Sequence, residues 1–196
     1  MQVGIDEVGR GCWAGPLVAA AVAFGAGTQI TGLNDSKKLS RSQRELLAAE
    51  IRASGAVVIG VGWVWPADID ISGITAAVKS AMSQAVQEVI AQLEGAYDTI
   101  IIDGNYNFLP ELPRVSTLVR ADGLIPQVSA ASIIAKVARD RYMADIAARE
   151  YPGYGFEKHV GYGTARHIEQ LLARGITPLH RKSFKPIQHI LLQSNQ

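Results

Sequence analysis

Apolar residues gather in short runs over the first two thirds of the chain and recur at helical spacing between and after these runs. The runs Met1–Ile5 and Leu17–Phe24 flank a glycine-rich bend, which predicts two strands of a hairpin. The run Val57–Trp65 predicts a third strand, and Asp98–Asp103 and Val115–Arg120 predict a fourth and a fifth. The pattern therefore indicates a five-stranded sheet.

Four stretches show the spacing of apolar positions that is typical of helices. They are Ser40–Ser54, Ile74–Leu93, Pro126–Glu150 and Thr164–Arg174. Ser40 suits the N-cap of the first helix, and Gly175 suits the end of the last one.

The order of these elements indicates an α/β fold, in which a central mixed sheet of five strands is flanked by helices. The chain contains no internal repeat, no low-complexity segment and no stretch with the composition of a linker. We therefore expect residues 1–196 to form a single catalytic domain, with residues from about 150 to 196 as a C-terminal helical extension.

The composition is that of an ordinary globular chain. Of the 196 residues, 48% are apolar, which is enough for a substantial core, and no apolar run is long enough to span a membrane. The first residues lack the basic region and long apolar stretch of a secretory signal. The single cysteine, Cys12, cannot form an internal disulfide, which favours the reducing cytoplasm.

The charges are unevenly distributed, although the net charge is only +1. Residues 1–113 carry 7 Lys and Arg against 12 Asp and Glu, whereas residues 114–196 carry 12 against 6. An acidic half joined to a basic half suits a site that holds cations beside a groove for a polyanion. A chance asymmetry of the solvated surface explains the same counts, so this feature alone does not decide between the two.

Carboxylates lie near the ends of three predicted strands. Asp6 and Glu7 directly follow the first strand, Asp103 ends the fourth, and Asp122 follows the fifth. Neighbours on a strand point to opposite faces, so Asp6 and Glu7 can reach one site only if the chain bends there. The glycine-rich residues that follow them allow such a bend.

A cluster of carboxylates without His or Cys favours Mg²⁺ or Mn²⁺ over zinc. Crowded acids repel one another unless a cation neutralises them. The pattern therefore indicates two-metal hydrolysis of a phosphodiester. Acids are also common at strand ends and turns for structural reasons, and spacing alone leaves that alternative open.

Six blocks of the sequence resemble the ribonuclease HII family, in the same order. They are DEVGRG at residues 6–11, NDSKKL at 34–39, DGN at 103–105, VSAASIIAKVARD at 128–140, HVGYGT at 159–164 and HRKSF at 180–184. Asp122 stands at the expected place before the long fourth block. Six ordered blocks are far more specific than any one of them, and together they span from about residue 3 to residue 186.

This resemblance implies a ribonuclease H-like fold and an endonuclease that cuts the RNA strand of RNA–DNA hybrids. It also implies cleavage on the 5′ side of ribonucleotides embedded in duplex DNA, the first step of their excision repair. The implied metal ligands are Asp6, Glu7, Asp103 and Asp122, which would hold Mg²⁺ or Mn²⁺. We expect a cytoplasmic monomer with no membrane contact.

The resemblance further implies how the substrate is held. Gly9, Arg10 and Gly11 would read the ribose 2′-OH, largely through backbone groups, because that hydroxyl both donates and accepts hydrogen bonds. Tyr162 would pack on the sugar or base after the ribonucleotide. Five further side chains would hold phosphates or support the site: Lys37, Ser132, Lys136, Arg139 and Arg181.

Several of these residues also have simpler interpretations. Tyr162, within a Gly-Tyr-Gly turn, could be an ordinary surface aromatic, and Lys37 could belong to a solvated surface. Lys136 and Arg139 share one face of a helix and could form structural ion pairs, for example with Asp140, instead of touching nucleic acid.

The histidines and tryptophans have structural interpretations as well. His159 and His180 are expected to be hydrogen-bonded structural residues, not metal ligands. The three tryptophans are expected to pack in the core or at its rim.

The chain departs from the family pattern at three places. Val160 stands where the family usually has Lys, Cys12-Trp13 where it more often has Pro-Leu, and Gly73 where it often has Asn. None of these is one of the four acids, so we expect them to affect affinity and stability more than activity.

Other classes fit less well. Ribonuclease HIII resembles this family but carries an additional N-terminal domain, for which no room is expected before Asp6. A type 1 ribonuclease H lacks the DEVGRG opening and the long fourth block. A non-catalytic hybrid-binding module would not need all four acids. A small phosphotransferase with Asp6 as nucleophile would need a phosphate-binding loop, which we do not find.

Overall fold

A mixed sheet of five strands forms the centre of the computed structural model, which describes residues 1–194. The strands are β1 (Gln2–Val8), β2 (Leu17–Phe24), β3 (Val57–Val64), β4 (Thr99–Asp103) and β5 (Val115–Leu118). Their order is β3-β2-β1-β4-β5. The pairs β1–β2 and β2–β3 are antiparallel, whereas β1–β4 and β4–β5 are parallel. The predicted α/β fold with a mixed five-stranded sheet is confirmed.

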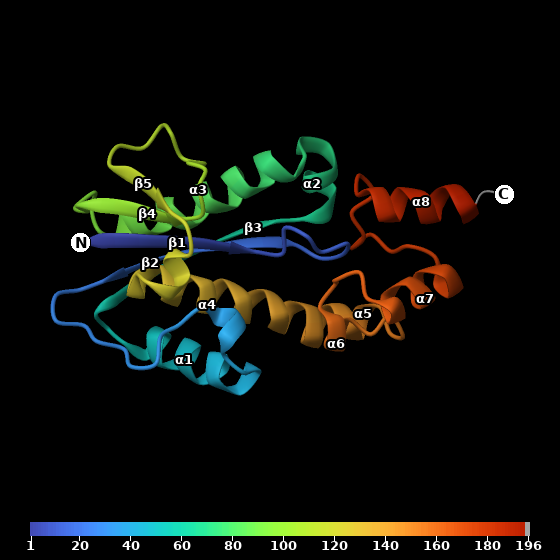
Figure 1. Ribbon diagram of the computed structural model, residues 1–196, viewed down its shortest axis with the longest axis horizontal. Helices are drawn as coiled ribbons and strands as arrows, with labels where there is room; N and C mark the ends of the chain where they lie inside the picture. Colours follow the sequence, from blue (N-terminus) through green and yellow to red (C-terminus); the bar gives the residue numbers. More distant parts are fainter. Residues whose placement is uncertain (195–196) are drawn as a thin grey trace.

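Helices cover both faces of this sheet (Figure 1). On one face lie α2 (Pro66–Ser72) and α3 (Ile74–Gln92), and on the other lie α1 (Arg41–Ala53) and α4 (Pro126–Arg141). The strand β2, which lies between β3 and β1, is apolar on both sides. Its odd-numbered residues join the core with α3, and its even-numbered residues join the core with α1 and α4.

Glycines let the helices approach the sheet closely. A Cβ on Gly60 or Gly62 of β3 would lie 2.1 or 2.0 Å from a backbone oxygen of α3. A Cβ on Gly4 of β1 would lie 2.3 Å from the backbone nitrogen of Val128. The last contact brings the start of α4 against β1, two residues before Asp6.

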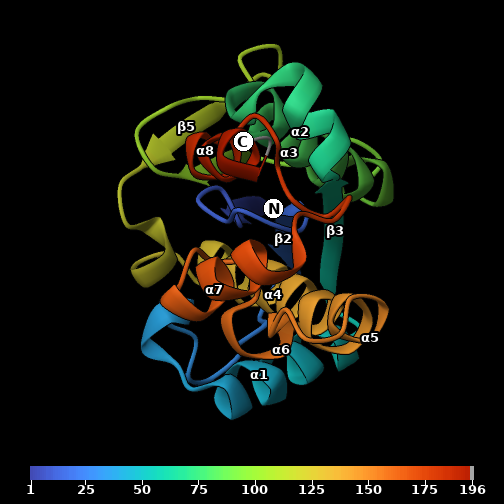
Figure 2. The ribbon, with the colours of Figure 1, turned by 90° about the vertical axis from the view of Figure 1, so that its right-hand side faces the viewer.

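The C-terminal part of the chain packs at one end of the sheet (Figure 2). It comprises α5 (Ala148–Glu150), α6 (Phe156–His159), α7 (Ala165–Arg174) and α8 (Lys185–Ser194). Their apolar side chains form a third cluster, which also takes in Ala14 and Met143. These helices therefore pack directly on the segment between β1 and β2.

Some boundaries differ from those predicted. The strand β1 continues through Asp6 and Glu7 to Val8, because all three residues pair with β2. The strand β5 stops at Leu118, since Arg120 takes a left-handed backbone conformation. The predicted helix Pro126–Glu150 contains a π-helical turn at Tyr142–Ala147.

Among the described residues, three α-helices lie outside the four predicted helical stretches: α2, α6 and α8. Within the described residues, no helix is long and apolar enough to cross a membrane.

Candidate active site

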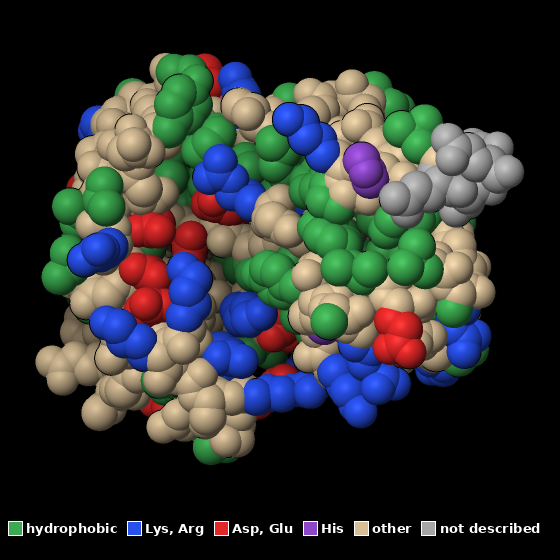
Figure 3. Space-filling model, turned by 45° about the vertical axis from the view of Figure 1, so that its right-hand side comes forward, with side chains coloured by type: hydrophobic (Ala, Val, Ile, Leu, Met, Phe, Trp, Pro, Cys, Tyr) green, Lys and Arg blue, Asp and Glu red, His purple; other side chains and the backbone are tan. Residues whose placement is uncertain are grey.

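Three carboxylates meet at one edge of the sheet. Asp6 lies in β1 and Asp103 at the end of β4, and the parallel register of Ile5 with Ile102 places the two acids side by side. Asp122 comes from the short 3-10 helix Ala121–Gly123 that precedes α4. One carboxylate oxygen from each acid lies within 4.8 Å of the others. Figure 3 shows acidic side chains in a hollow bordered by Lys and Arg.

Hydrogen bonds from the backbone and from hydroxyl groups fix this arrangement. The Glu7 N–H donates to Asp6 Oδ1 at 2.8 Å, and the Ala121 N–H donates to Asp103 Oδ1 at 2.7 Å. The Ser129 hydroxyl donates to the Asp122 carbonyl at 2.5 Å, which ties the short 3-10 helix to α4. The acids are thus held in place without consuming all of their oxygens.

Burial and mutual repulsion make the negative charges costly. The pKa of Asp6 lies well above its usual value, first because it is buried and then because Glu7 and Asp103 are near; a hydrogen bond from Ser132 partly offsets the rise. Burial followed by the charges of Asp103 and Asp35 raises the pKa of Asp122. Crowded, hard oxygen donors of this kind fit a divalent cation, which would relieve the repulsion.

Glu7 occupies a different position from the one predicted. The bend expected near Asp6 and Glu7 comes later, at Gly9, where φ is +93°. Because Glu7 is still within β1, it points to the opposite face of the sheet from Asp6. It forms an ion pair with Arg10 at 3.2 Å and is absent from the group of three close acids. Burial nevertheless raises its pKa, and the Asp103 charge adds to the rise.

The two serines near Asp6 form a link between distant segments. Ser36, in the 3-10 helix Ser36–Lys38, lies 2.8 Å from Ser132 of α4, hydroxyl to hydroxyl, and both are buried. The same short helix carries Lys37, which lines a cavity of about 370 Å³ with Asp103 and Asp122. Sequence reasoning singled out Lys37 and Ser132 but missed Ser36, although it belongs to the NDSKKL block.

Arg139 and Arg181 do not reach the surface. Both side chains are 0% exposed. Arg139 donates to the carbonyls of Pro16, Val160 and Ala14 at 2.8–3.0 Å. Of the two predicted roles, contact with phosphate or support of the site, these contacts fit support of the site, because the guanidinium groups are buried and donate to backbone carbonyls.

Arg181 holds the same loop from another side. Its guanidinium donates to the carbonyl of Gly15 and to that of Arg10 at 2.9–3.1 Å. Burial and the neighbouring Arg139 charge lower its pKa to about 10. Together, the two arginines fasten the loop that contains Gly9, Arg10 and Gly11.

The two glycines of this loop have different surroundings. A Cβ on Gly9 would lie 2.5 Å from Arg139 Nε, whereas a Cβ on Gly11 would meet nothing within 4 Å. A side chain at position 9 would therefore clash within the protein, whereas the space beside Gly11 is open to a ligand.

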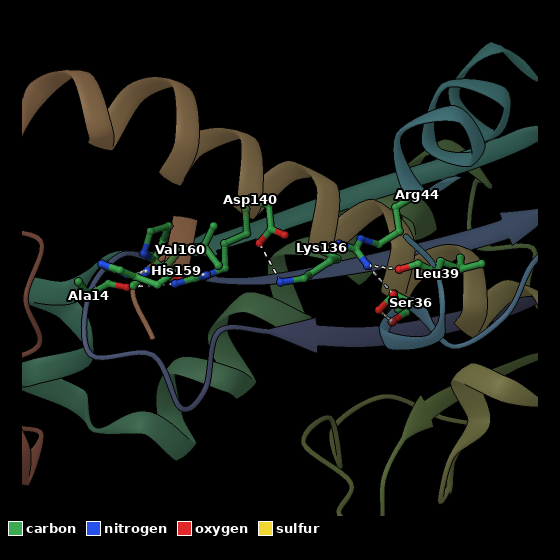
Figure 4. Close-up of polar contacts among 12 residues, drawn as sticks. Ala14, Ser36, Leu39, Arg44, Lys136, Asp140, His159 and Val160 are labelled. Carbon is green, nitrogen blue, oxygen red and sulfur yellow. Dashed lines mark hydrogen bonds and ion pairs between the residues drawn. The ribbon is translucent and has the colours of Figure 1, made fainter. Parts of the chain in front are cut away.

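Lys136 and Tyr162 lie beside the loop. The Lys136 ammonium forms an ion pair with Asp140 at 2.9 Å, which Figure 4 shows on α4, and sits 5.9 Å from the centre of the Tyr162 ring. The Tyr162 side chain is 41% exposed, and burial of its hydroxyl end together with Cys12 raises its pKa to about 12. The ring is thus partly open to a ligand while its hydroxyl is held on the protein side.

His159 and His180 make hydrogen bonds within the protein, as predicted, and His167 lies beside them. His167 Nε2 and His180 Nε2 lie 3.0 Å apart in the interior. His180 Nδ1 accepts the N–H of Thr177, and His159 Nδ1 accepts that of Gly161. The neutral rings therefore act as fixed hydrogen-bond partners that hold the segment around Tyr162.

Comparison with known proteins gives consistent matches over nearly the whole chain. The family model described as Ribonuclease HII matches residues 3–187. The Ribonuclease HII of Shewanella woodyi is 46% identical over 198 residues, covering 97% of this chain and 90% of the relative. That of Bacillus cytotoxicus is 48% identical and covers 96% of this chain and 70% of the relative.

Solved structures give the same picture. The structure of the PCNA:RNase HII complex from Archaeoglobus fulgidus matches with a TM-score of 0.76 at 31% identity, covering 97% of this chain and 96% of that one. A Bst-RNase HIII crystallised in complex with Mn²⁺ matches with a TM-score of 0.80, covering 98% of this chain and 70% of that one. Its identity is 22%, so it supports the fold alone.

Proposed function

Because the chain belongs to the ribonuclease HII family, we propose that its acidic site cuts the RNA strand of RNA–DNA hybrids and cuts 5′ of ribonucleotides embedded in duplex DNA. The chain is a ribonuclease HII enzyme, and its acidic cluster fits a metal-dependent site. The observation that carries the proposal is the meeting of three carboxylates, from three separate elements, within 4.8 Å of one another.

Asp6, Asp103 and Asp122 are the proposed ligands of Mg²⁺ or Mn²⁺, and Glu7, whose pKa the Asp103 charge also raises, is the proposed fourth acid. When bound, two such ions supply an activated water and stabilise charge on the attacking and leaving oxygens. The pKa values of Asp6 and Asp122 support this assignment: burial raises them first and repulsion between the acids second, and a bound cation would offset the cost of both. The Bst-RNase HIII structure holds Mn²⁺ in a protein of the same fold.

The loop Gly9–Gly11 is proposed to read the ribose 2′-OH, and Tyr162 to pack against the neighbouring sugar or base. Arg139 and Arg181 support the proposal by keeping the loop carbonyls turned inward. Lys37 is the proposed phosphate contact, because it lines the cavity beside Asp103 and Asp122. In this proposal the whole chain, including the helices after residue 150, works as one catalytic unit and as a cytoplasmic monomer.

The test is cleavage of an end-labelled duplex that carries one ribonucleotide, in Mg²⁺ or Mn²⁺. We expect a cut on the 5′ side of the ribonucleotide that leaves 3′-OH and 5′-phosphate ends, because an external water attacks and the 2′-OH does not. Recovery of 2′,3′-cyclic phosphate, or full activity in excess chelator, would refute this mechanism. Tight binding of the duplex without any cleavage would favour a non-catalytic hybrid-binding module.

A further inference from the structure

A second open space adjoins the acids, on the α3 side of the sheet. Asp103 lines the Lys37 cavity and also a cavity of about 340 Å³ that contains Arg10 and Tyr106. A further cavity of about 330 Å³ shares Tyr106 with it and ends at Lys79 of α3. We call the two connected spaces the Tyr106 groove. It is defined by Arg10, Thr75, Lys79, Asn105, Tyr106 and Phe108.

Tyr106 stands on a fixed support within this groove. Its side chain is 58% exposed, and its ring centre lies 4.7 Å from that of the buried Phe108 at an interplanar angle of 62°. The Arg10 guanidinium lies 5.8 Å from the centre of the same Phe108 ring. A flat ring that is backed by a second ring loses little freedom when a ligand packs on it, so it is a favourable contact surface.

The charges along the groove fit a phosphate-linked ligand. Arg10 lies at the end beside the acids and Lys79 at the far end, with the aromatic ring between them. Both cations keep about half of their side chains exposed, although each pairs with a carboxylate, Glu7 or Glu111. Alternation of cations with an aromatic face is how proteins hold single strands of nucleic acid without reading their sequence.

We propose that the Tyr106 groove binds the substrate strand where it leaves the acids on the α3 side, with one nucleoside turned out of the helical stack and packed on the Tyr106 ring. This inference rests on the proposed function, because it takes the strand at Asp103 to be the one that is cut. Stacking on an aromatic ring tolerates any base, so Tyr106 contributes affinity and position without a preference for sequence.

The test compares Tyr106→Ala, Tyr106→Leu and Tyr106→Phe on the single-ribonucleotide duplex. Tyr106→Leu still covers Phe108 but removes the flat face, so both it and the alanine variant should lower kcat/KM by about five- to a hundred-fold, the range typical of a lost stacking contact. Tyr106→Phe should stay within about two-fold of the parent. Leu172→Ala, at an apolar residue of α7 that is 61% exposed, is the matched control and should change nothing.

A set of duplexes with one abasic position, moved stepwise away from the ribonucleotide, locates the contact. The parent enzyme should lose activity when the abasic position lies at one particular place on one side of the ribonucleotide. Tyr106→Ala should cleave that duplex as well as it cleaves the duplex without an abasic position. Equal kcat/KM for all variants, or equal sensitivity of parent and Tyr106→Ala at every abasic position, would overturn the proposal. Binding of the same duplexes without metal, measured by fluorescence anisotropy, tests the Tyr106 groove even if the parent enzyme does not cleave. The proposed function and the proposed groove can therefore be refuted independently.

Discussion

Arg139→Met should destabilise the fold strongly while leaving the salt dependence of substrate binding unchanged. The substitution keeps much of the side-chain volume but removes the donors to the carbonyls of Ala14, Pro16 and Val160. A buried polar group left without a partner costs about 1–3 kcal/mol, and three carbonyls lose their donor here. We therefore expect a loss of about 3–5 kcal/mol, a large part of the 5–15 kcal/mol typical of a domain.

Arg139→Lys separates charge from geometry. It keeps the positive charge, but one ammonium cannot match the forked set of donors that reaches three carbonyls. We expect a clear loss of stability for this variant too, measured by urea unfolding without metal. If charge toward phosphate were the role of Arg139, the lysine variant would instead be nearly as stable and as tightly bound as the parent.

The salt dependence of duplex binding provides the second measurement. Each phosphate contact contributes about −0.9 to the slope of log K against log salt concentration on duplex DNA. Arg139→Met should leave the slope of the folded protein unchanged, whereas Lys37→Ala should flatten it by about one unit with little change in stability. A flatter slope with intact stability for Arg139→Met would show that the Arg139 side chain contacts phosphate in the complex and is not buried there.

Three further predictions concern the acids, the histidines and the aromatic residue at the loop. Asp103→Asn should abolish most turnover, and near-parental turnover in saturating Mg²⁺ would contradict this prediction. The same variant should stabilise the metal-free protein by about 1 kcal/mol at neutral pH, measured by thermal unfolding. The reason is that the Asp103 charge raises the pKa of Asp6, Glu7 and Asp122. Burial lowers the pKa of His180 to about 3, whereas unfolded histidines titrate near 6.5, so the unfolded state binds protons first and this contribution to stability falls as pH drops from about 6.5 toward 3. The variant His180→Gln should flatten that decline relative to the parent, the exposed His189→Gln should not, and identical pH profiles for all three proteins would refute the argument. Tyr162→Ala should reduce cleavage at a single ribonucleotide by about five- to a hundred-fold and cleavage of a long hybrid by less, because the long hybrid offers many registers; equal losses on both substrates would leave the residue with a structural role.

Local patterns were sufficient to predict the sheet and the three acids that the structure brings together. Apolar runs bounded by glycines and turns define all five strands, and a parallel pairing brings Asp6 beside Asp103 because their strands are neighbours. The place of the bend after Asp6 and Glu7 was predicted wrongly, while the role of Glu7 as a fourth acid stays a prediction. The strand β1 continues two residues further than its apolar run, since pairing with the buried strand β2 outweighs the polarity of those positions. A strand end that lies among charged residues is set by its partner strand, which the local pattern does not contain.

The role of the two arginines could not be predicted from the sequence because it depends on contacts between distant segments. Arginine in an enzyme that acts on nucleic acid suggests a phosphate contact, and helical spacing alone gives Arg139 no reason to be buried. The structure supplies the reason through glycines far from it in sequence. A Cβ on Gly9 or Gly15 would lie 2.5 or 3.3 Å from its guanidinium group, and one on Gly161 would lie 3.4 Å away. The absence of side chains at these glycines leaves room for the Arg139 guanidinium. It can therefore donate to carbonyls of the loop between β1 and β2 and to the carbonyl of Val160. It follows that these glycines and Arg139 form a single structural unit. Because the loop carbonyls are held on the protein side, we propose that the remaining backbone groups of the loop face the substrate.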